Sequence, residues 1–257
     1  MKVVILAGGF GTRISEESSL KPKPMVEIGN KPILWHIMKY YSSFGFDDFV
    51  ICLGYKGTVI KEYFSNYYLH ASDITIDFRN NNAVTFHHNV AEPWKITLVD
   101  TGLTTMTGGR IKRIAPYIDE DQFMVTYGDG LSDVDLNKLL LFHQQHSGSI
   151  TITSVQPKGR FGVLNLDEKS KVEGFIEKPE KGGSWINAGY MVMDRSVFDF
   201  IDSDQTELET NILLPFSDQG KLYAYKHEGF WQPMDTVWEK NKLEQLLKSK
   251  EAPWIRW

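Results

Sequence analysis

The chain opens with an uninterrupted apolar run, residues 3–7, that leads directly into the turn Gly8-Gly-Phe-Gly-Thr-Arg13. An apolar run of this length is typical of a buried strand. A glycine-rich turn placed right after such a strand leaves backbone N–H groups free to approach an anion closely. Arg13 and the lysines of Lys21-Pro-Lys-Pro24 supply matching positive charge. The opening therefore predicts a sheet whose first loop binds a polyphosphate such as a nucleotide.

Strand-like and helix-like segments alternate through about residue 155, which favours a mostly parallel sheet with crossover helices on both faces. The expected strands of this half are 3–7, 49–53, 74–78, 84–88, 96–100, 123–127 and 149–155, and the expected helices are 32–44, 58–67, 109–117 and 135–146. Beyond it, strands are expected at 162–166, 172–176, 186–193 and 222–226, the first two forming a hairpin. A last helix, 237–248, is expected to begin with a capping box of Thr236 and Glu239. We expect this second half to bind the substrate and to extend the same sheet.

Composition excludes some classes of partner and indicates the cellular compartment. With 257 residues, 42% of them hydrophobic, the chain is long enough to bury a full core. A net charge of -5 argues against nucleic acid or an anionic membrane as the main partner. The single cysteine, Cys52, lies in an apolar run, which predicts an unreactive buried thiol and a reducing compartment. The chain begins directly in a strand and no apolar stretch reaches the length of a membrane span, so we expect a cytoplasmic protein.

The spacing of the glycine loop excludes two common phosphate-binding motifs. A dinucleotide fingerprint that starts at Gly9 would need glycine where Ile14 stands, and the Gly-Lys-Ser/Thr sequence of a P-loop is absent. By itself the loop is equally compatible with a simple tight turn. Because Pro22 and Pro24 restrict the backbone on both sides of Lys23, that lysine is held at a lower entropic cost than a free surface lysine. The lysine loop therefore favours phosphate binding over a plain turn.

Two aspartates stand at positions suited to a metal ion. Tyr127-Gly-Asp-Gly130 follows a buried strand, and ligands of open α/β sheets bind at the carboxyl ends of strands, where an aspartate is well placed to hold Mg²⁺ beside a triphosphate. Asp235 ends the run Trp231-Gln-Pro-Met-Asp235. A turn explains Asp129 equally well, and a helix start explains Asp235. The two form a metal pair only if the fold brings them together, which their spacing does not show.

A further polar group lies in the second half of the chain, in Phe175-Ile-Glu-Lys-Pro179 and Trp185-Ile-Asn-Ala-Gly189. Glu177 and Asn187 suit sugar hydroxyls, and Lys178 suits a sugar phosphate as a point charge. The alternative is a pair of ordinary turns at strand ends, which are often built from Asn, Gly and Pro.

Together these motifs resemble those of the sugar-1-phosphate nucleotidylyltransferases, in order and across essentially the whole chain. The matching runs are Gly8-Gly-Phe-Gly-Thr-Arg13, Lys21-Pro-Lys-Pro24, Gly128-Asp129, Glu177-Lys178-Pro179 and Asn187-Ala-Gly189. The resemblance implies the nucleotide-diphospho-sugar transferase fold, an α/β fold with a mixed, mostly parallel Rossmann-like sheet flanked by helices and a small additional β-rich sugar-binding lobe. It also implies one domain, 1–257, with the nucleotide bound by about 1–155 and the sugar phosphate by about 156–257.

Within this family the resemblance is strongest to the branch that transfers a cytidylyl group from CTP to glucose 1-phosphate, giving CDP-glucose and pyrophosphate. The runs that carry it are Ile14-Ser-Glu-Glu17, Lys31-Pro-Ile-Leu-Trp-His-Ile-Met38, Val99-Asp-Thr-Gly102, Met106-Thr-Gly-Gly-Arg110, Gly229-Phe-Trp-Gln-Pro-Met-Asp235 and Ala252-Pro-Trp254. The thymidylyl and uridylyl branches usually have proline where Glu16 stands. Asn30 departs from the family pattern, in which glycine is frequent at that turn. The branch implies a role in making deoxysugars for bacterial surface polysaccharide such as lipopolysaccharide O-antigen.

The resemblance also implies roles for individual residues. Lys23, Arg13 and Asp129 are the expected catalytic residues, and Asp129 and Asp235 are the expected ligands of a Mg²⁺ cofactor. The expected nucleotide-binding residues are Leu6, Ala7, Gly8, Gly9, Phe10, Gly11, Thr12, Arg13, Lys23, Thr104, Thr105, Arg110 and Gly128. The expected sugar-phosphate-binding residues are Tyr127, Glu177, Lys178, Trp185, Asn187 and Gly189.

Alternatives stay open at this point. The same reaction with UTP or dTTP differs only in a few loop hydrogen bonds to the base. A catalytically silent homologue that regulates a partner is a second alternative, against which the intact Arg13, Lys23, Asp129 and Asp235 argue. An unrelated sugar-binding module would not need the lysine loop. Relatives commonly assemble, and 7 tryptophans and 11 tyrosines provide apolar surface. We therefore expect a homo-oligomer, for instance a hexamer, with CTP and glucose 1-phosphate as partners and no nucleic-acid or membrane partner.

Overall fold

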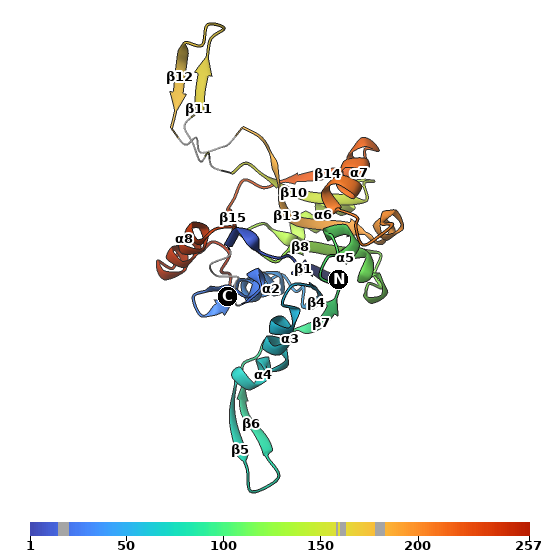
Figure 1. The fold of residues 1–257 in the computed structure, drawn as a ribbon, viewed down its shortest axis with the longest axis vertical. Helices are drawn as coiled ribbons and strands as arrows, with labels where there is room; N and C mark the ends of the chain where they lie inside the picture. Colours follow the sequence, from blue (N-terminus) through green and yellow to red (C-terminus); the bar gives the residue numbers. More distant parts are fainter. Residues whose placement is uncertain (15–20, 158, 160–162, 178–182) are drawn as a thin grey trace.

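The computed structural model describes residues 1–14, 21–157, 159, 163–177 and 183–257. Within these residues the centre is a seven-stranded sheet with helices on both faces (Figure 1). The strand order is β14-β10-β13-β8-β1-β4-β7. In that order the strands are Leu222–Lys226, Ile150–Val155, Ile186–Asp194, Gln122–Tyr127, Lys2–Leu6, Asp48–Leu53 and Lys95–Asp100.

Most neighbours in this sheet run parallel. Strand β1 pairs in parallel with β4 and β8, β4 with β7, and β10 with β14, whereas β13 runs antiparallel to both β8 and β10. The mixed, mostly parallel sheet that the sequence predicted is therefore confirmed. Because β1, β4, β7 and β8 point the same way, the loops at their carboxyl ends meet along one edge of the sheet.

Side chains of β1 alternate between two apolar clusters, one on each face of the sheet. Val3 and Ile5 join the cluster covered by α2 (Ile33–Ser42), α6 (Leu136–Gln144) and α8 (Val237–Lys248). Val4 and Leu6 join the cluster covered by α5 (Thr107–Arg113) and α7 (Leu214–Asp218). All five residues of β1 are buried, as expected for a strand in the middle of an α/β sheet. The helices are α2 (Ile33–Ser42), α3 (Gly57–Ser65), α4 (Tyr67–His70), α5 (Thr107–Arg113), α6 (Leu136–Gln144), α7 (Leu214–Asp218) and α8 (Val237–Lys248).

Several short elements were not predicted from the sequence. The most important is the pairing of β9 (Gly130–Ser132) with β15 (Trp231–Pro233), because it joins two distant parts of the chain beside the sheet. Strands β2 (Glu27–Ile28) and β3 (Lys31–Pro32) form a small hairpin before α2. The remaining short elements are the 3₁₀ helices Thr12–Ile14, Lys23–Met25, Ala115–Tyr117 and Arg195–Phe200 and the π-helix Glu209–Leu213.

Two β-hairpins extend from the body at opposite ends of the molecule (Figure 1). One is formed by β5 (Ser72–Asp77) and β6 (Ala83–Asn89), and the other by β11 (Val163–Leu166) and β12 (Val172–Ile176). The predicted hairpin of the second half is thus confirmed, although residue 162 lies outside the described residues. Strands β13 and β14 belong to the central sheet, whereas β11 and β12 form a separate two-stranded sheet.

Two predicted helices differ from the observed ones. The helix expected at 58–67 is divided into α3 and α4 at Asn66, whose side-chain Nδ2 donates to the carbonyl of Glu62 at 2.9 Å and ends the first helix. The helix expected at 109–117 begins earlier, at Thr107, and α5 ends at Arg113. A 3₁₀ turn that contains Pro116 follows it, because proline lacks the N–H that would continue the α-helical ladder.

The last helix confirms its predicted start and end. Thr236 Oγ1 accepts from the N–H of Glu239 at 3.2 Å, and the Glu239 carboxylate accepts from the N–H of Thr236 at 3.0 Å. Cys52 is buried as expected, and burial raises the pKa of its thiol to about 12. Among the described residues, no helix is both long enough and apolar enough to cross a membrane.

Candidate active site

The glycine loop lies at the carboxyl end of β1, between β4 and β8. Ala7 N–H donates to the carbonyl of Cys52 on β4 at 3.0 Å, which keeps the chain in the sheet one residue beyond the strand. Gly9 and Phe10 are exposed. Gly11 has φ +66°, a left-handed conformation that glycine adopts at little cost. The loop ends in the 3₁₀ helix Thr12–Ile14, which contains Arg13.

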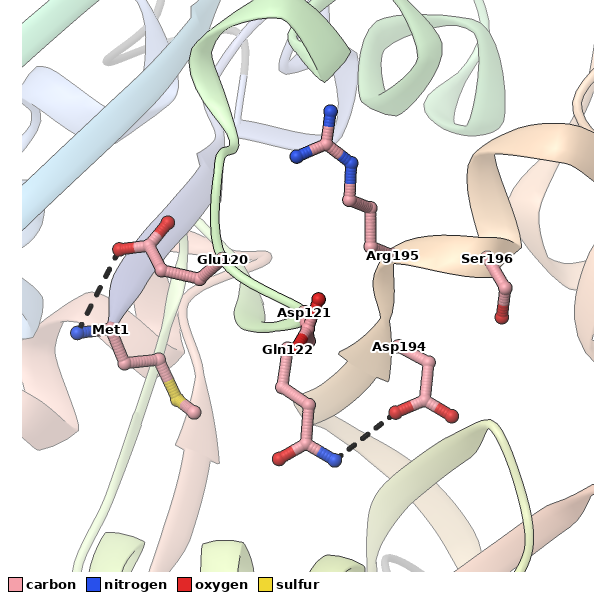
Figure 2. A pocket seen from close by; sticks show the side chains of 7 residues that line it. All are labelled: Met1, Glu120, Asp121, Gln122, Asp194, Arg195 and Ser196. Atoms are coloured by element: carbon pink, nitrogen blue, oxygen red, sulfur yellow. Dashed lines mark hydrogen bonds and ion pairs between the residues drawn. The ribbon is translucent and has the colours of Figure 1, made fainter.

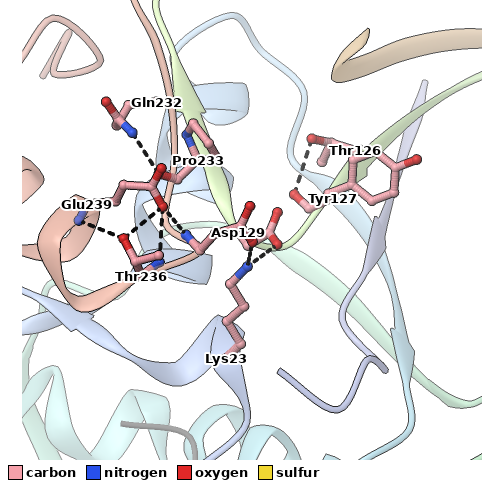
Figure 3. Close-up of polar contacts among 9 residues, drawn as sticks. Lys23, Thr126, Tyr127, Asp129, Gln232, Pro233, Thr236 and Glu239 are labelled. Carbon is pink, nitrogen blue, oxygen red and sulfur yellow. Dashed lines mark hydrogen bonds and ion pairs between the residues drawn. The ribbon is translucent and has the colours of Figure 1, made fainter. Parts of the chain in front are cut away.

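Lys23 joins two aspartates at the same edge of the sheet. It begins the 3₁₀ helix Lys23–Met25 between Pro22 and Pro24, and it is only 8% exposed. Its Nζ donates to Oδ2 of Asp129 and to Oδ1 of Asp235, both at 2.6 Å; Figure 3 shows the first of these partners. Lys21, by contrast, pairs with Glu27 at the surface at 2.9 Å. The structure thus brings Lys23, Asp129 and Asp235 together in one cluster.

The unpredicted pairing of β9 with β15 is what places the two aspartates side by side. Asp129 precedes β9 and Asp235 follows β15, and Pro233 lies opposite Gly130 in the register. The N–H of Met234 donates to the carbonyl of Asp129 at 2.8 Å. The N–H of Asp235 in turn donates to Oε2 of Glu239 at 2.8 Å, so Glu239, which forms the capping box of α8 with Thr236, also holds the aspartate. Figure 3 shows the two residues of this capping box. Asp235 therefore lies directly before the cap of α8 and also contacts Lys23, while its role as a metal ligand stays a prediction.

The electrostatics of this cluster keep the Lys23 side chain protonated. Burial alone would lower the pKa of the Lys23 ammonium, but the charge of Asp129 and the hydrogen bonds to both aspartates outweigh burial and raise that pKa above its ordinary value. The side chains of Asp129 and Asp235 are 33% and 25% exposed, so one side of each carboxylate faces solvent. A cation can approach them from there.

The two carboxylates fit a divalent cation of the Mg²⁺ type. Such an ion is usually held by one or two carboxylates and takes its other ligands from water and substrate phosphates. Among the residues that the structure describes, no group of three or more His, Cys, Asp or Glu side chains could hold a metal ion. A cation at Asp129 and Asp235 would therefore depend on the substrate to complete its coordination.

Tyr127 is fixed from two sides just before this cluster. Gly189 has φ +81°, and a Cβ atom there would lie 2.4 Å from Cδ2 of the Tyr127 ring, so the ring occupies the space that any larger residue would need. The Tyr127 hydroxyl donates to the carboxylate of Glu209, which also accepts from Oγ1 of Thr107 at 3.3 Å. Gly128 N–H donates to the carbonyl of Leu6 at 3.0 Å. The strand end that carries Asp129 is thus well anchored.

The predicted sugar-phosphate group is only partly assembled. Asn187 lies near the start of β13, and its Oδ1 accepts from the N–H of Gly189 at 2.9 Å. Trp185 is half-exposed, and the Lys226 ammonium lies 5.4 Å from the centroid of its ring. Glu177 follows β12 in the extended hairpin, and Lys178 lies outside the described residues, as do Ser15, Glu16 and Glu17. The sugar-phosphate roles of these residues stay predictions.

The loop after β7 and the following helix α5 contain the residues predicted to contact the base. Thr104 is exposed, whereas Thr105 and Arg110 are buried. The guanidinium of Arg110 does not point out of the loop: it donates to main-chain carbonyls of the glycine loop and of the segment after β7. Arg110 therefore has a structural role between these two loops. Contacts of Arg110, Thr104 and Thr105 with the base stay predictions.

Sequence reasoning missed two contributors to the site. Glu209 begins a π-helix, a rare element that often lies at functional sites, and no sequence pattern pointed to it. Strand β15 was missed because it is only three residues long and includes Pro233. The run Trp231-Gln-Pro-Met-Asp235 indicated an aspartate of the site and a family resemblance, but no strand.

A hollow of about 640 Å³ lies at the opposite edge of the sheet (Figure 2). Gln122 begins β8 and Asp194 ends the antiparallel β13, so both mark the amino ends of the parallel strands. None of the predicted site residues lines this hollow, and it is separate from the Lys23 cluster. Its lining residues are Met1, Glu120, Asp121, Gln122, Asp194, Arg195 and Ser196.

The chain is similar in sequence to known proteins over its full length. The family model described as nucleotidyl transferase matches residues 2–238. The chain is 53% identical to a glucose-1-phosphate cytidylyltransferase of Salmonella typhi over 258 aligned residues, which cover 100% of each chain. It is 38% identical to a probable glucose-1-phosphate cytidylyltransferase of Bacillus subtilis, again over 100% of both.

A solved structure has a similar fold. The crystal structure of HddC from Yersinia pseudotuberculosis superimposes with a TM-score of 0.68 at 25% identity, covering 96% of this chain and 99% of that one. The family match spans the glycine loop, Lys23, Asp129 and Asp235, which the fold gathers at one edge of the sheet. The chain therefore belongs to the nucleotidyl transferase family.

Proposed function

We propose that this nucleotidyltransferase transfers a cytidylyl group from CTP to α-D-glucose 1-phosphate and releases pyrophosphate. The observation that carries the proposal is the cluster of Lys23, Asp129 and Asp235 beside the glycine loop. A buried ammonium held between two carboxylates suits a reaction in which negative charge moves between phosphoryl groups. The full-length similarity to glucose-1-phosphate cytidylyltransferases, at 53% identity, supports CTP and glucose 1-phosphate as the substrates.

The reaction needs no nucleophile from the protein. A phosphate oxygen of glucose 1-phosphate forms a bond to the α-phosphorus of CTP, and the bond from that phosphorus to the oxygen of the leaving pyrophosphate breaks. Charge develops on the α-phosphoryl oxygens and on the leaving group, so the protein contributes by positioning and by electrostatic stabilisation. The proposed roles are triphosphate binding for the main chain of Gly8–Gly11 with Arg13, and stabilisation of the α-phosphoryl charge for Lys23.

Asp129 and Asp235 are the proposed ligands of Mg²⁺. Nucleotidyltransferases generally use a divalent metal ion, and two partly exposed carboxylates on either side of Lys23 provide oxygen ligands of the kind that Mg²⁺ prefers. The ion would supply positive charge to the phosphoryl oxygens of the nucleotide. In that arrangement the protonated Lys23 limits the repulsion between the two carboxylates and keeps both directed toward the same point.

The experiment that tests this function identifies the product. The purified chain is incubated with CTP, glucose 1-phosphate and Mg²⁺, and the mixture is analysed by mass spectrometry for CDP-glucose and by a coupled assay for pyrophosphate. We expect the two products in equal amounts. Binding of CTP without either product would instead support a catalytically silent homologue.

We also propose that the protein is a homo-oligomer in the cytoplasm. The resemblance favours a homo-oligomer, and the exposed apolar side chains Phe78, Phe86 and Phe175 on the two extended hairpins are compatible with a contact surface. A single buried cysteine fits a reducing, cytoplasmic setting. Light scattering on the purified protein would distinguish a hexamer from smaller assemblies.

A further inference from the structure

Glu209 is an exposed carboxylate held by hydroxyls from two other elements. It begins the π-helix Glu209–Leu213. Its Oε1 accepts from the hydroxyl of Tyr127, the last residue of β8, and its Oε2 accepts from Oγ1 of Thr107 at 3.3 Å. An exposed glutamate otherwise samples many rotamers, so holding it in one position costs side-chain entropy. These two hydrogen bonds from distant parts of the chain fix the carboxylate beside Tyr127.

The ring of Tyr127 lies across Gly189 of the neighbouring strand. Strands β8 and β13 are antiparallel with Thr126 opposite Tyr190, so Tyr127 and Gly189 are the next two residues in the register. Gly189 has φ +81°, and a Cβ atom there would lie 2.4 Å from Cδ2 and 3.1 Å from Cε2 of the ring. The tyrosine ring therefore takes the place of a side chain at position 189 and packs directly on the main chain of β13.

The first residues of β13 are supported from two sides. The carbonyl of Ala188 accepts from Nε1 of Trp231 on β15 at 2.8 Å, and the Tyr127 ring covers Gly189. The N–H of Gly189 in turn donates to Oδ1 of Asn187 at 2.9 Å, which fixes the direction of the Asn187 side chain. The position of Asn187 thus depends on where the Tyr127 ring lies.

The hydroxyl of Tyr127 is not needed to fill space. The ring is half-buried against the apolar cluster on the face of α5 and α7. Burial and the negative charge of Glu209 raise the pKa of the phenol, so it remains a protonated donor. A phenylalanine ring would cover Gly189 equally well and would need no acceptor. Because a hydrogen bond to a carboxylate is strong and directional, the contact with Glu209 serves to fix the direction of the ring.

We propose that Glu209 is a positioning residue for glucose 1-phosphate: through the Tyr127 ring it holds Gly189, and with it Asn187, in the arrangement that receives the sugar. Glu209 acts through these contacts and not on the reacting atoms. Its place at the start of a π-helix fits this role, since such helices are frequent at functional sites. The inference rests on the proposed function, because it takes glucose 1-phosphate as the substrate that Asn187 contacts.

The test measures the two substrates separately in the full-length protein. Glu209→Ala removes the acceptor of the Tyr127 hydroxyl, and we expect the KM for glucose 1-phosphate to rise about tenfold, as for the loss of a hydrogen bond to a charged group. The KM for CTP should change by less than about twofold. Glu209→Gln keeps a carbonyl oxygen that can accept from Tyr127, and its KM for glucose 1-phosphate should stay within about threefold of the original value.

Glu207→Ala is the matched control. Glu207 lies two residues earlier, is also exposed, and its carboxylate accepts from Oγ1 of Thr210 at 2.8 Å. The variant removes the same charge from the same segment without touching Tyr127, so both KM values should be those of the original protein. A purely structural role for Glu209 predicts instead that Glu209→Ala lowers the melting temperature and leaves both KM values unchanged, which would overturn the inference.

A double-mutant cycle tests the route through Tyr127 and keeps the test decisive if Glu209→Ala does not fold. Tyr127→Phe keeps the ring but removes the hydroxyl, and we expect a similar rise in the KM for glucose 1-phosphate. Adding Glu209→Ala to it should raise that KM by less than about a further twofold. Additive rises, or an equal rise in the KM for CTP, would overturn the inference. Absence of CDP-glucose with the original protein would instead overturn the proposed function, so the two failures are distinguishable.

Discussion

Asp129 and Asp235 share a single cation, since Oδ2 of the first and Oδ1 of the second each lie 2.6 Å from the ammonium of Lys23. The two aspartates lie at the same end of the antiparallel β9–β15 ribbon although they are distant in the sequence, so their proximity is a product of the fold. Both carboxylates raise the pKa of Lys23 above its ordinary value despite its burial. Lys23 therefore stays protonated, between two carboxylates, where the α-phosphoryl group is proposed to react.

Replacing Lys23 by methionine tests that charge directly. Lys23→Met keeps the length of the side chain, and we expect kcat to fall about 100-fold or more, because stabilisation of the transition-state charge is lost. The KM for CTP should change much less. Steady-state kinetics of pyrophosphate release provide the measurement. Lys21→Met is the matched control, since Lys21 pairs with Glu27 at the surface; equal losses in both variants would contradict the role of Lys23.

Removing both carboxylates tests the metal site. In Asp129→Asn combined with Asp235→Asn, we expect Mg²⁺-dependent synthesis to fall by about 100-fold or more while the far-UV circular dichroism spectrum is retained. The comparison is Asp194→Asn, at the other edge of the sheet, which should keep its Mg²⁺ dependence. Full activity of the double variant at ordinary Mg²⁺ concentration would remove both aspartates from the metal site.

Gly8 and Gly9 should respond differently to the same substitution. A Cβ atom on Gly8 would overlap the guanidinium of Arg110, whereas a Cβ atom on Gly9 would have nothing within 4 Å. We therefore expect Gly8→Ala to destabilise the fold by about 1–3 kcal/mol, the usual cost of overpacking, and Gly9→Ala to leave the melting temperature nearly unchanged. Differential scanning calorimetry measures both. Equal melting temperatures for the two variants would show that Arg110 moves aside freely.

His36 should make stability depend on pH. Its ring is 4% exposed, its Nε2 pairs with the carbonyl of Ile28 at 2.9 Å, and Trp254 Nε1 donates to its Nδ1 at 3.4 Å, which together describe a neutral imidazole. Burial lowers its pKa below the ordinary value of 6.5. Below about pH 6.5 the unfolded chain therefore binds a proton that the folded chain resists, so stability falls as the pH falls.

The measurement for His36 is urea unfolding of the original protein and of His36→Gln between about pH 7 and about pH 5. Glutamine keeps a donor and an acceptor but does not titrate, so the variant should lose less stability over this range. His143 and His146, whose pKa values are also lowered, remain in both proteins as a common background. Parallel stability curves would rule out a contribution from His36.

Much of the fold could be predicted from local sequence patterns. The apolar run at 3–7 predicted β1 within one residue at each end, and the spacing of Thr236 and Glu239 predicted the start of α8. Hydrophobic period and capping are local, so they are visible in the sequence. Strands β9 and β15 were missed because three-residue strands with glycine or proline show no alternation, and their pairing depends on distant contacts.

The site, too, could be predicted only in part, because its residues are brought together by contacts between distant parts of the chain. The prolines around Lys23 indicated a fixed lysine, but only the β9–β15 pairing shows that this lysine contacts both aspartates. The sequence Met106-Thr-Gly-Gly-Arg110 indicated a functional arginine without showing the direction of its guanidinium. The direction follows from packing against Gly8 and Gly54, which no local pattern encodes.

A comparison of nucleotides tests most directly whether this chain makes CDP-glucose from CTP. The purified protein is supplied with glucose 1-phosphate, Mg²⁺ and either CTP, UTP, dTTP, ATP or GTP, and pyrophosphate is measured in each reaction. We predict rapid release with CTP and release at least about 100-fold slower with every other nucleotide. Release that is equally fast with UTP or dTTP, or absent with CTP, would contradict the account.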